Sequence, residues 1–174
     1  DAFVGQLRAL ASEVKEARER VRTALKNAGF RLPAKKITIN LTPADVRKSG
    51  TGCDLPMAAS VLAAFGFLDE HILSSYLLLG EVGLNGSILP TKGVLSTAVL
   101  AQKEGMQGIV VPWENAREAA ILDTVKVIPV KNLKEFVQIC QQELPETCFY
   151  REQQDFWKTE YDVDFAELRG QPML

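Results

Sequence analysis

Cysteine and histidine are scarce in this chain. Cys53, Cys140 and Cys148 are the three cysteines, they form no CxxC spacing, and His71 is the single histidine. An odd number of cysteines without paired spacing argues against a disulfide scaffold and against a zinc site. A lone histidine supports neither a metal site nor a serine–histidine triad, so we interpret His71 as a surface residue. We therefore expect a protein of the reducing cytoplasm that holds no metal.

Long apolar runs and the phosphate loop of ATPases are also missing. No apolar run approaches the roughly 20 residues that a membrane span needs, and no signal peptide opens the sequence, so we expect no membrane partner. The pattern GxxxxGK[ST] occurs nowhere in the 174 residues. This chain by itself is therefore expected to bind no nucleotide cofactor and not to hydrolyse ATP.

Charge is distributed unevenly along the sequence. Residues 1–50 carry 11 Lys/Arg against 5 Asp/Glu, whereas residues 143–174 carry 3 against 8. A basic segment is able to contact nucleic acid, and the candidate contacts are Arg18 and Arg22 together with Arg47 and Lys48. Lysines and arginines alternate with glutamates in the first helical pattern, so a solvated helix face is the simpler interpretation.

The most informative stretch covers residues 36–56. Alternating apolar residues predict a strand over 36–41, and a polar run with Pro and Gly predicts a loop over 42–52. Asp54 is expected to cap a helix over 57–65, with a proline in its first turn. Because the first-turn N–H groups of a helix are unpaired, a loop that faces them is able to bind phosphate or a DNA backbone. A solvated loop is the alternative interpretation.

Helical and strand patterns alternate through the rest of the chain. We predict helices over 12–28, 69–73, 93–104, 115–121 and 132–143, and strands over 76–79, 87–89, 108–111 and 125–130. Ser12 and Asn132 are the expected N-caps. The dipeptide Asn85–Gly86 predicts a hairpin with a two-residue turn, in which both residues have positive φ. This order of elements predicts the α/β class, with α+β layers.

Three stretches together resemble one protein family. They are VKEARERVRTALKNAGF (14–30), KITINLTPADVRKSGTGCDLP (36–56) and LGEVGLNGSILPTKGVL (79–95). Their order and spacing are similar to the N-terminal half of the magnesium-chelatase-like ATPases of the ComM/YifB type, which carry a Lon-protease-type domain in front of an AAA+ motor. The resemblance implies a Lon-protease-like domain with a mixed sheet, one hairpin and packed helices over 1–143. A linker over 144–174 would then lead into a missing AAA+ ATPase module.

The resemblance also allows a test for peptidase chemistry. Active Lon proteases have a serine just before a helix, at or near the position of Cys53, and a lysine on the helix after the hairpin, near Leu95. This chain has neither residue there, and Lys92 stands three residues early. Cys53 as nucleophile with Lys92 as base is the weak catalytic alternative, and a half-buried cysteine without chemistry is the interpretation we favour. Glu81, beside the hairpin, is interpreted as an exposed turn-flanking acid.

The end of the sequence resembles the approach to an AAA+ module. In DFAELRGQPML (164–174), the resemblance places Phe165, Gly170 and Gln171 near the adenine. It implies ATP and magnesium as cofactors of a longer bacterial protein that forms a homo-oligomeric ring with its own AAA+ module. The function it implies is a non-catalytic accessory domain that aids ring assembly or DNA handling, as in ComM-like DNA branch migration. The alternatives are a degenerate Lon-type peptidase with a Cys53 nucleophile and a stand-alone DNA-binding module.

Overall fold

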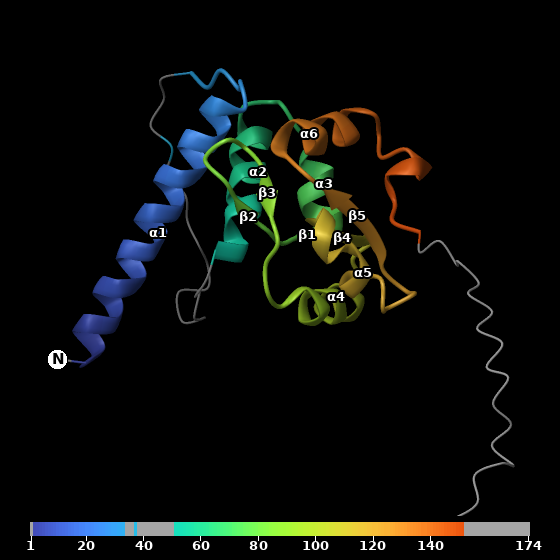
Figure 1. The fold of residues 1–174 in the computed structure, drawn as a ribbon, viewed down its shortest axis with the longest axis horizontal. Coiled ribbons are helices and arrows are strands. Elements are labelled where there is room, and N and C mark those ends of the chain that lie inside the picture. Colours follow the sequence, from blue (N-terminus) through green and yellow to red (C-terminus); the bar gives the residue numbers. More distant parts are fainter. Residues whose placement is uncertain (1, 34–36, 38–50, 152–174) are drawn as a thin grey trace, which may run out of the picture.

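Three parallel strands form the centre of the fold (Figure 1). A computed structural model describes residues 2–33, 37 and 51–151, with the backbone alone for 2–13 and 51. The sheet has the order β1 (Tyr76–Leu78), β4 (Gly108–Pro112), β5 (Lys126–Val130), and both pairings are parallel. Every residue of β4 is buried, as is β5 after its first residue, because helices cover both faces. This explains why both strands are continuous apolar runs in the sequence.

A hairpin forms a second, antiparallel sheet of two strands. β2 (Glu81–Val82) pairs with β3 (Ile88–Leu89), so a hairpin forms around Asn85–Gly86 as predicted. Its first arm is β2, whereas the strand predicted over 76–79 pairs with β4 in the parallel sheet. The predicted two-residue turn is wrong. The N–H of Gly83 donates to the carbonyl of Ser87 at 2.9 Å, which leaves three residues in the loop, and Gly86 (φ 84°) is the one residue there with positive φ. Such a loop combines an ordinary turn with one left-handed residue, so the asparagine needs no strained backbone.

Six α-helices and three short 3-10 helices complete the described part of the chain. They are α1 (Ala2–Asn27), η1 (Thr51–Cys53), α2 (Asp54–Ala64), α3 (Glu70–Ser75), α4 (Val94–Lys103), η2 (Trp113–Asn115), α5 (Ala116–Ala119), α6 (Leu133–Gln141) and η3 (Glu146–Cys148). The helix predicted from Ser12 begins at Ala2 instead, because residues 2–11 are rich in helix formers and contain no proline. The strand predicted over 36–41 lies outside the described residues, apart from Ile37.

One face of α1 is apolar and buried. Ala17, Val21, Leu25 and Ala28 are buried at steps of three and four residues. This face packs on α2 and on the hairpin. A Cβ atom at Gly86 would stand 2.8 Å from the Cβ of Ala28, so the hairpin loop approaches the end of α1 too closely for a side chain there.

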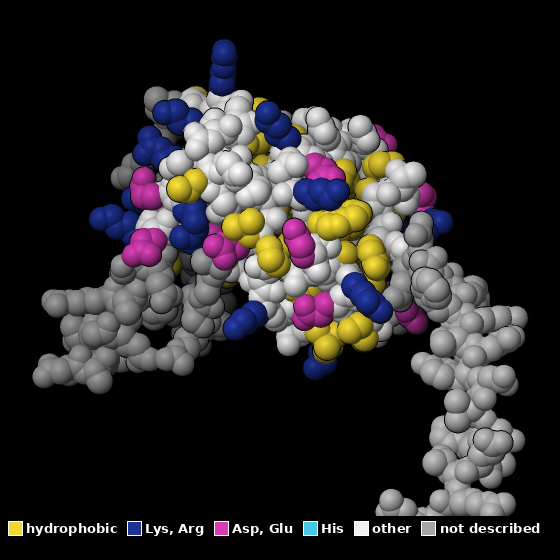
Figure 2. Space-filling model, viewed as in Figure 1, with side chains coloured by type: hydrophobic (Ala, Val, Ile, Leu, Met, Phe, Trp, Pro, Cys, Tyr) yellow, Lys and Arg dark blue, Asp and Glu magenta, His cyan; other side chains and the backbone are white. Residues whose placement is uncertain are grey.

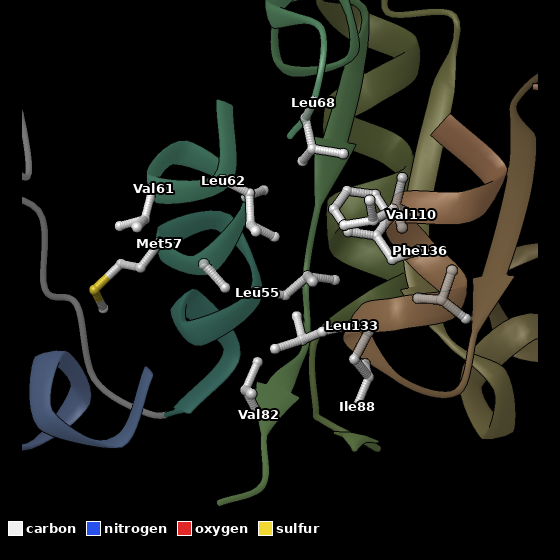
Figure 3. Close-up of a cluster of buried hydrophobic side chains, with 14 of the residues drawn as sticks. Leu55, Met57, Val61, Leu62, Leu68, Val82, Ile88, Val110, Leu133 and Phe136 are labelled. Atoms are coloured by element: carbon white, nitrogen blue, oxygen red, sulfur yellow. The ribbon is translucent and has the colours of Figure 1, made fainter. Parts of the chain in front are cut away.

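Two apolar clusters cover the opposite faces of the parallel sheet. In β4, Val110 belongs to the cluster with α1, α2 and α6, whereas Ile109 and Val111 belong to the cluster with α4 and α5. Figure 3 shows the first cluster, where Leu55 of α2 and Phe136 of α6 meet among labelled residues of the hairpin and sheet. The fold class is therefore confirmed as helices layered on strands, with parallel and antiparallel pairs in two separate sheets.

A short segment after α6 returns to the edge of the sheet. Glu143 and Leu144 both have positive φ (57° and 53°), which is uncommon for residues other than glycine and reverses the chain. The N–H of Tyr150 then donates to the carbonyl of Val127 in β5 at 2.7 Å. The ring of Phe149 lies 4.7 Å from the ammonium of Lys126. We call residues 145–150 the exit strap; residues 152–174 lie outside the described part.

Candidate functional site

Asp54 joins three elements at the start of α2. The prediction that it caps this helix is wrong, because Cys53 takes the N-cap position and Asp54 is the first helical residue, 1% exposed. Its carboxylate forms a bidentate ion pair with Arg20 of α1, with Nε–Oδ2 at 2.7 Å and Nη2–Oδ1 at 2.9 Å. The N–H of Val82 in β2 also donates to Oδ2, at 3.3 Å. Both carboxylate oxygens are therefore engaged by the protein itself.

The electrostatics of Arg20 reflect this junction. The hydrogen bond to Asp54 raises the pKa of the guanidinium above its ordinary value, and partial burial opposes this effect. The charges of Asp54, Glu81 and Glu16 favour the charged form further. Glu81 is half-buried rather than exposed, which corrects the sequence interpretation. The arrangement stabilises the contact of α1 with α2 and the hairpin.

The segments that carry Cys53 and Lys92 adjoin each other. The N–H of Leu55 donates to the carbonyl of Gly80 at 3.0 Å, and the N–H of Gly80 donates to the carbonyl of Gly52 at 2.9 Å. A Cβ atom at Gly52 would stand 3.3 Å from Oγ1 of Thr91, the residue before Lys92. Cys53 is half-buried and Lys92 is exposed. The fold thus brings both weak catalytic candidates to one side of the sheet.

A buried asparagine fixes the approach to α4. Asn115 is 9% exposed; its Oδ1 accepts from the N–H of Thr91 at 3.0 Å, and its Nδ2 donates to the carbonyl of Thr91 at 3.1 Å. Glu118 accepts from the N–H of Leu95 at 3.3 Å, in the first turn of α4. A carboxylate of the protein therefore already occupies this helix end. Sequence reasoning missed the network, because Asn115 carries only the signal of a helix start.

Basic side chains line the outer side of α1. Figure 2 shows Lys and Arg gathered there, with acids between them. Arg18 and Arg22 are exposed, and Nη2 of Arg18 lies 3.3 Å from Oε1 of the equally exposed Glu19. An exposed pair of this kind contributes little to stability. Arg47 and Lys48 lie outside the described residues, so the predicted cluster of four basic residues stays a prediction.

A groove of about 890 Å³ runs beside α1. Its apolar wall includes Leu25 and the following residues Phe30 and Leu32, with Val61 of α2 opposite. The ring of Phe30 stands edge-on to that of Phe67, with ring centres 5.4 Å apart. We call this depression the α1 groove.

The single histidine and the three cysteines all lie in the described part of the chain. His71 is exposed and hydrogen-bonds Oγ of Ser75, which confirms it as a surface residue. No disulfide joins Cys53, Cys140 and Cys148, and burial raises the pKa of Cys140 to about 12. Within residues 2–33, 37 and 51–151, no group of three or more His, Cys, Asp or Glu residues is placed to hold a metal ion. No helix in those ranges is long and apolar enough to cross a membrane.

Comparison with known proteins shows the family of the chain. The sequence model described as "Subunit ChlI of Mg-chelatase" matches residues 4–115. The chain belongs to the magnesium-chelatase-related family of ComM and YifB. The competence protein ComM of Haemophilus influenzae is 35% identical over 161 residues, covering 91% of this chain and 31% of ComM. YifB of Salmonella typhimurium is 47% identical over 109 residues, covering 63% and 21%.

The ComM/YifB domain is also similar to Lon proteases. Lon protease 2 of Bacillus subtilis is 30% identical over 127 residues, covering 71% of this chain and 22% of that protein. At the two positions that the Lon resemblance assigns to a Ser–Lys pair, this chain has Cys53 and the 38% exposed Leu95. The chain spans less than a third of the length of these relatives. The candidate adenine-side residues Phe165, Gly170 and Gln171 lie outside the described part.

Proposed function

We propose that this chain is a non-catalytic accessory domain of a ComM/YifB-type AAA+ ATPase, and that it aids ring assembly or DNA handling by the motor. One observation carries the proposal. Where a Lon-type peptidase needs a serine and a lysine, this domain has a half-buried cysteine and an apolar Leu95. The neighbouring polar groups are already engaged within the protein, Asp54 by Arg20 and the N–H of Leu95 by Glu118.

The exposure of Lys92 also supports a non-catalytic role. A nucleophile needs a base within hydrogen-bond reach, and a lysine acts as a base after its ammonium is desolvated. Lys92 is exposed to solvent. One polar network connects α1, α2 and the hairpin, and a second connects Asn115 and Glu118 to the start of α4, which suits a rigid body that transmits force or contacts a partner.

ATP and magnesium belong to the motor in this proposal. The sequence of this chain contains no phosphate loop, and its described residues offer no metal-ligating cluster. These residues do not fit a nucleotide site, and no step of ATP hydrolysis is assigned to them. The full-length protein would act as a cytoplasmic homo-oligomeric ring, with the DNA branch migration expected of ComM-like proteins as its activity.

The DNA part of the proposal is tested by a salt titration of this chain with fluorescent single-stranded, duplex and branched DNA. We expect binding that weakens steeply with salt, because each phosphate contact releases counterions. Arg22→Glu should weaken binding about tenfold and flatten the salt dependence by about one unit of slope. Lys103→Glu is the matched control, an equally exposed basic residue on α4. Absence of binding at low salt would remove the DNA role and leave ring assembly.

The non-catalytic part is tested with a thiol-reactive peptide probe and a fluorogenic protein substrate. We expect no cleavage by the wild-type chain and no change on Cys53→Ser. Cleavage that disappears both in Cys53→Ser and in Lys92→Met would overturn the proposal in favour of a degenerate peptidase. Loss in only one variant would also count against it, because any true turnover contradicts a non-catalytic domain.

A further inference from the structure

The α1 groove has the size and lining of a peptide site. Pockets of roughly 300–1,000 Å³ hold drug-sized ligands, so a groove of about 890 Å³ accommodates two or three large side chains. Its wall includes apolar side chains, and the ring of Phe30, packed edge-on to Phe67, offers an aromatic surface. Apolar pockets of this kind receive the aromatic anchors that dominate many protein interfaces.

The rim of the groove is positively charged and therefore favours a negatively charged ligand. Among the described residues, four basic ones line it, namely Arg18, Arg22, Lys26 and Arg31, against one acid, Glu19. All four basic residues are exposed. A cationic rim around an apolar wall is complementary to an acidic peptide with aromatic residues, because charge steers the encounter and the rings fill the groove. The paired bases of a DNA duplex offer no side group able to enter it.

One stretch of this chain has that composition. Residues 152–162, EQQDFWKTEYD, carry four acids against one lysine. They also contain Phe156, Trp157 and Tyr161. Tryptophan and tyrosine are among the residues most enriched where binding energy concentrates.

We propose that residues 152–162 of one copy bind in the α1 groove of a second copy. In Figure 1, α1 lies on one side of the body and the exit strap on the other. A domain of about 150 residues has a radius of gyration of about 15 Å, so a path around half its circumference is about 60 Å. Eleven extended residues span at most about 40 Å. The segment therefore reaches a neighbour's groove more readily than its own.

A contact between opposite sides of successive copies is head-to-tail. Such a heterologous contact closes into a ring when the rotation between copies divides the circle. The inference thus rests on the proposed function in ring assembly, and names the surface and the segment that would carry it.

The test uses the full 174-residue chain and a fluorescein-labelled peptide of residues 152–162. Fluorescence anisotropy should show binding that weakens with added salt. The double variant Arg22→Glu/Arg31→Glu should bind at least tenfold more weakly, whereas Lys103→Glu should match the wild type. A peptide with Phe156, Trp157 and Tyr161 all changed to serine should lose binding, and this comparison needs no protein variant to fold. Unlabelled peptide should reduce self-association of the chain in sedimentation experiments.

Two results would overturn the inference. One is a peptide that binds the wild type no better than it binds Arg22→Glu/Arg31→Glu, which includes a peptide that binds neither. The other is binding of single-stranded DNA, but not the peptide, through Arg22 and Arg31, which would make the groove a nucleic-acid surface and leave the proposed DNA role intact. Conversely, peptide binding without DNA binding supports the inference and removes only the DNA part of the proposed function.

Discussion

Replacing Arg20 with leucine tests whether the ion pair with Asp54 holds α1 against α2 and the hairpin. Asp54 is 1% exposed and receives two hydrogen bonds from Arg20 and one from the N–H of Val82. In Arg20→Leu the carboxylate retains the bond from the N–H of Val82. A buried charge would then lack its counter-charge at the junction of three elements.

The expected magnitude follows from burial. Removing one partner of a buried ion pair costs about 3–5 kcal/mol. The Arg20 side chain is 24% exposed, so water partly solvates the site, and we expect the lower end, about 3 kcal/mol. For a chain of this size that lowers Tm by about 6–12 °C. Domains are commonly stable by only about 5–15 kcal/mol, so such a loss is readily measured.

A double-mutant cycle separates the pair from the general effect of each substitution. Urea unfolding followed by circular dichroism would compare Arg20→Leu, Asp54→Leu and the double variant. We expect the double variant to lose less than the sum of the single losses, because it leaves no uncompensated charge and two apolar side chains can pack together. The reasoning is refuted if Arg20→Leu costs under about 1 kcal/mol, or if the two single losses add within about 0.5 kcal/mol.

Three further predictions concern single residues. Burial raises the pKa of Cys140 to about 12 from an ordinary value of 9.0, so the unfolded chain releases this proton first. Between pH 9 and pH 12 the free energy of unfolding should therefore fall by about 1.4 kcal/mol per pH unit. Urea unfolding at several pH values should show this slope in the wild type and not in Cys140→Ala. Gly86→Ala should lower the free energy of unfolding more than Gly93→Ala. Both glycines have φ near 85°, but an added Cβ atom meets another side chain at Gly86 and none at Gly93. Equal losses in urea unfolding would contradict this. Asn115→Ala should lower the free energy of unfolding by about 1–3 kcal/mol and speed hydrogen exchange of the Thr91 amide, which donates to Asn115. Unchanged exchange at Thr91 would argue against this hydrogen bond.

Local patterns in the sequence predicted most elements correctly. The side chain of Asn132 accepts from the N–H of Glu135 at 2.9 Å, as expected of an N-cap for α6. Gly66 and Gly105 follow α2 and α4 with positive φ. These features depend on a few neighbouring residues, so the sequence contains their signal directly.

Contacts between distant segments could not be predicted in the same way. Asp54 has the local appearance of a helix cap, and its partner Arg20 lies 34 positions away in another helix. The same holds for Asn115 and Thr91, separated by 24 positions. Periodicity shows which face of a helix is buried, but not which polar group meets another inside the protein. The candidate site depends on such pairs, so the sequence did not show that its polar groups are hydrogen-bonded to one another.

The exit strap has a consequence for solubility. β5 is an outer strand of the parallel sheet, and an uncovered outer strand offers unpaired backbone groups to strands of other molecules. The bond from Tyr150 to Val127 and the ring of Phe149 over Lys126 cover part of this border. Shortening the chain to residue 144 would therefore leave an apolar strand open to pairing between molecules, and such a variant should aggregate at concentrations where the whole chain stays dispersed.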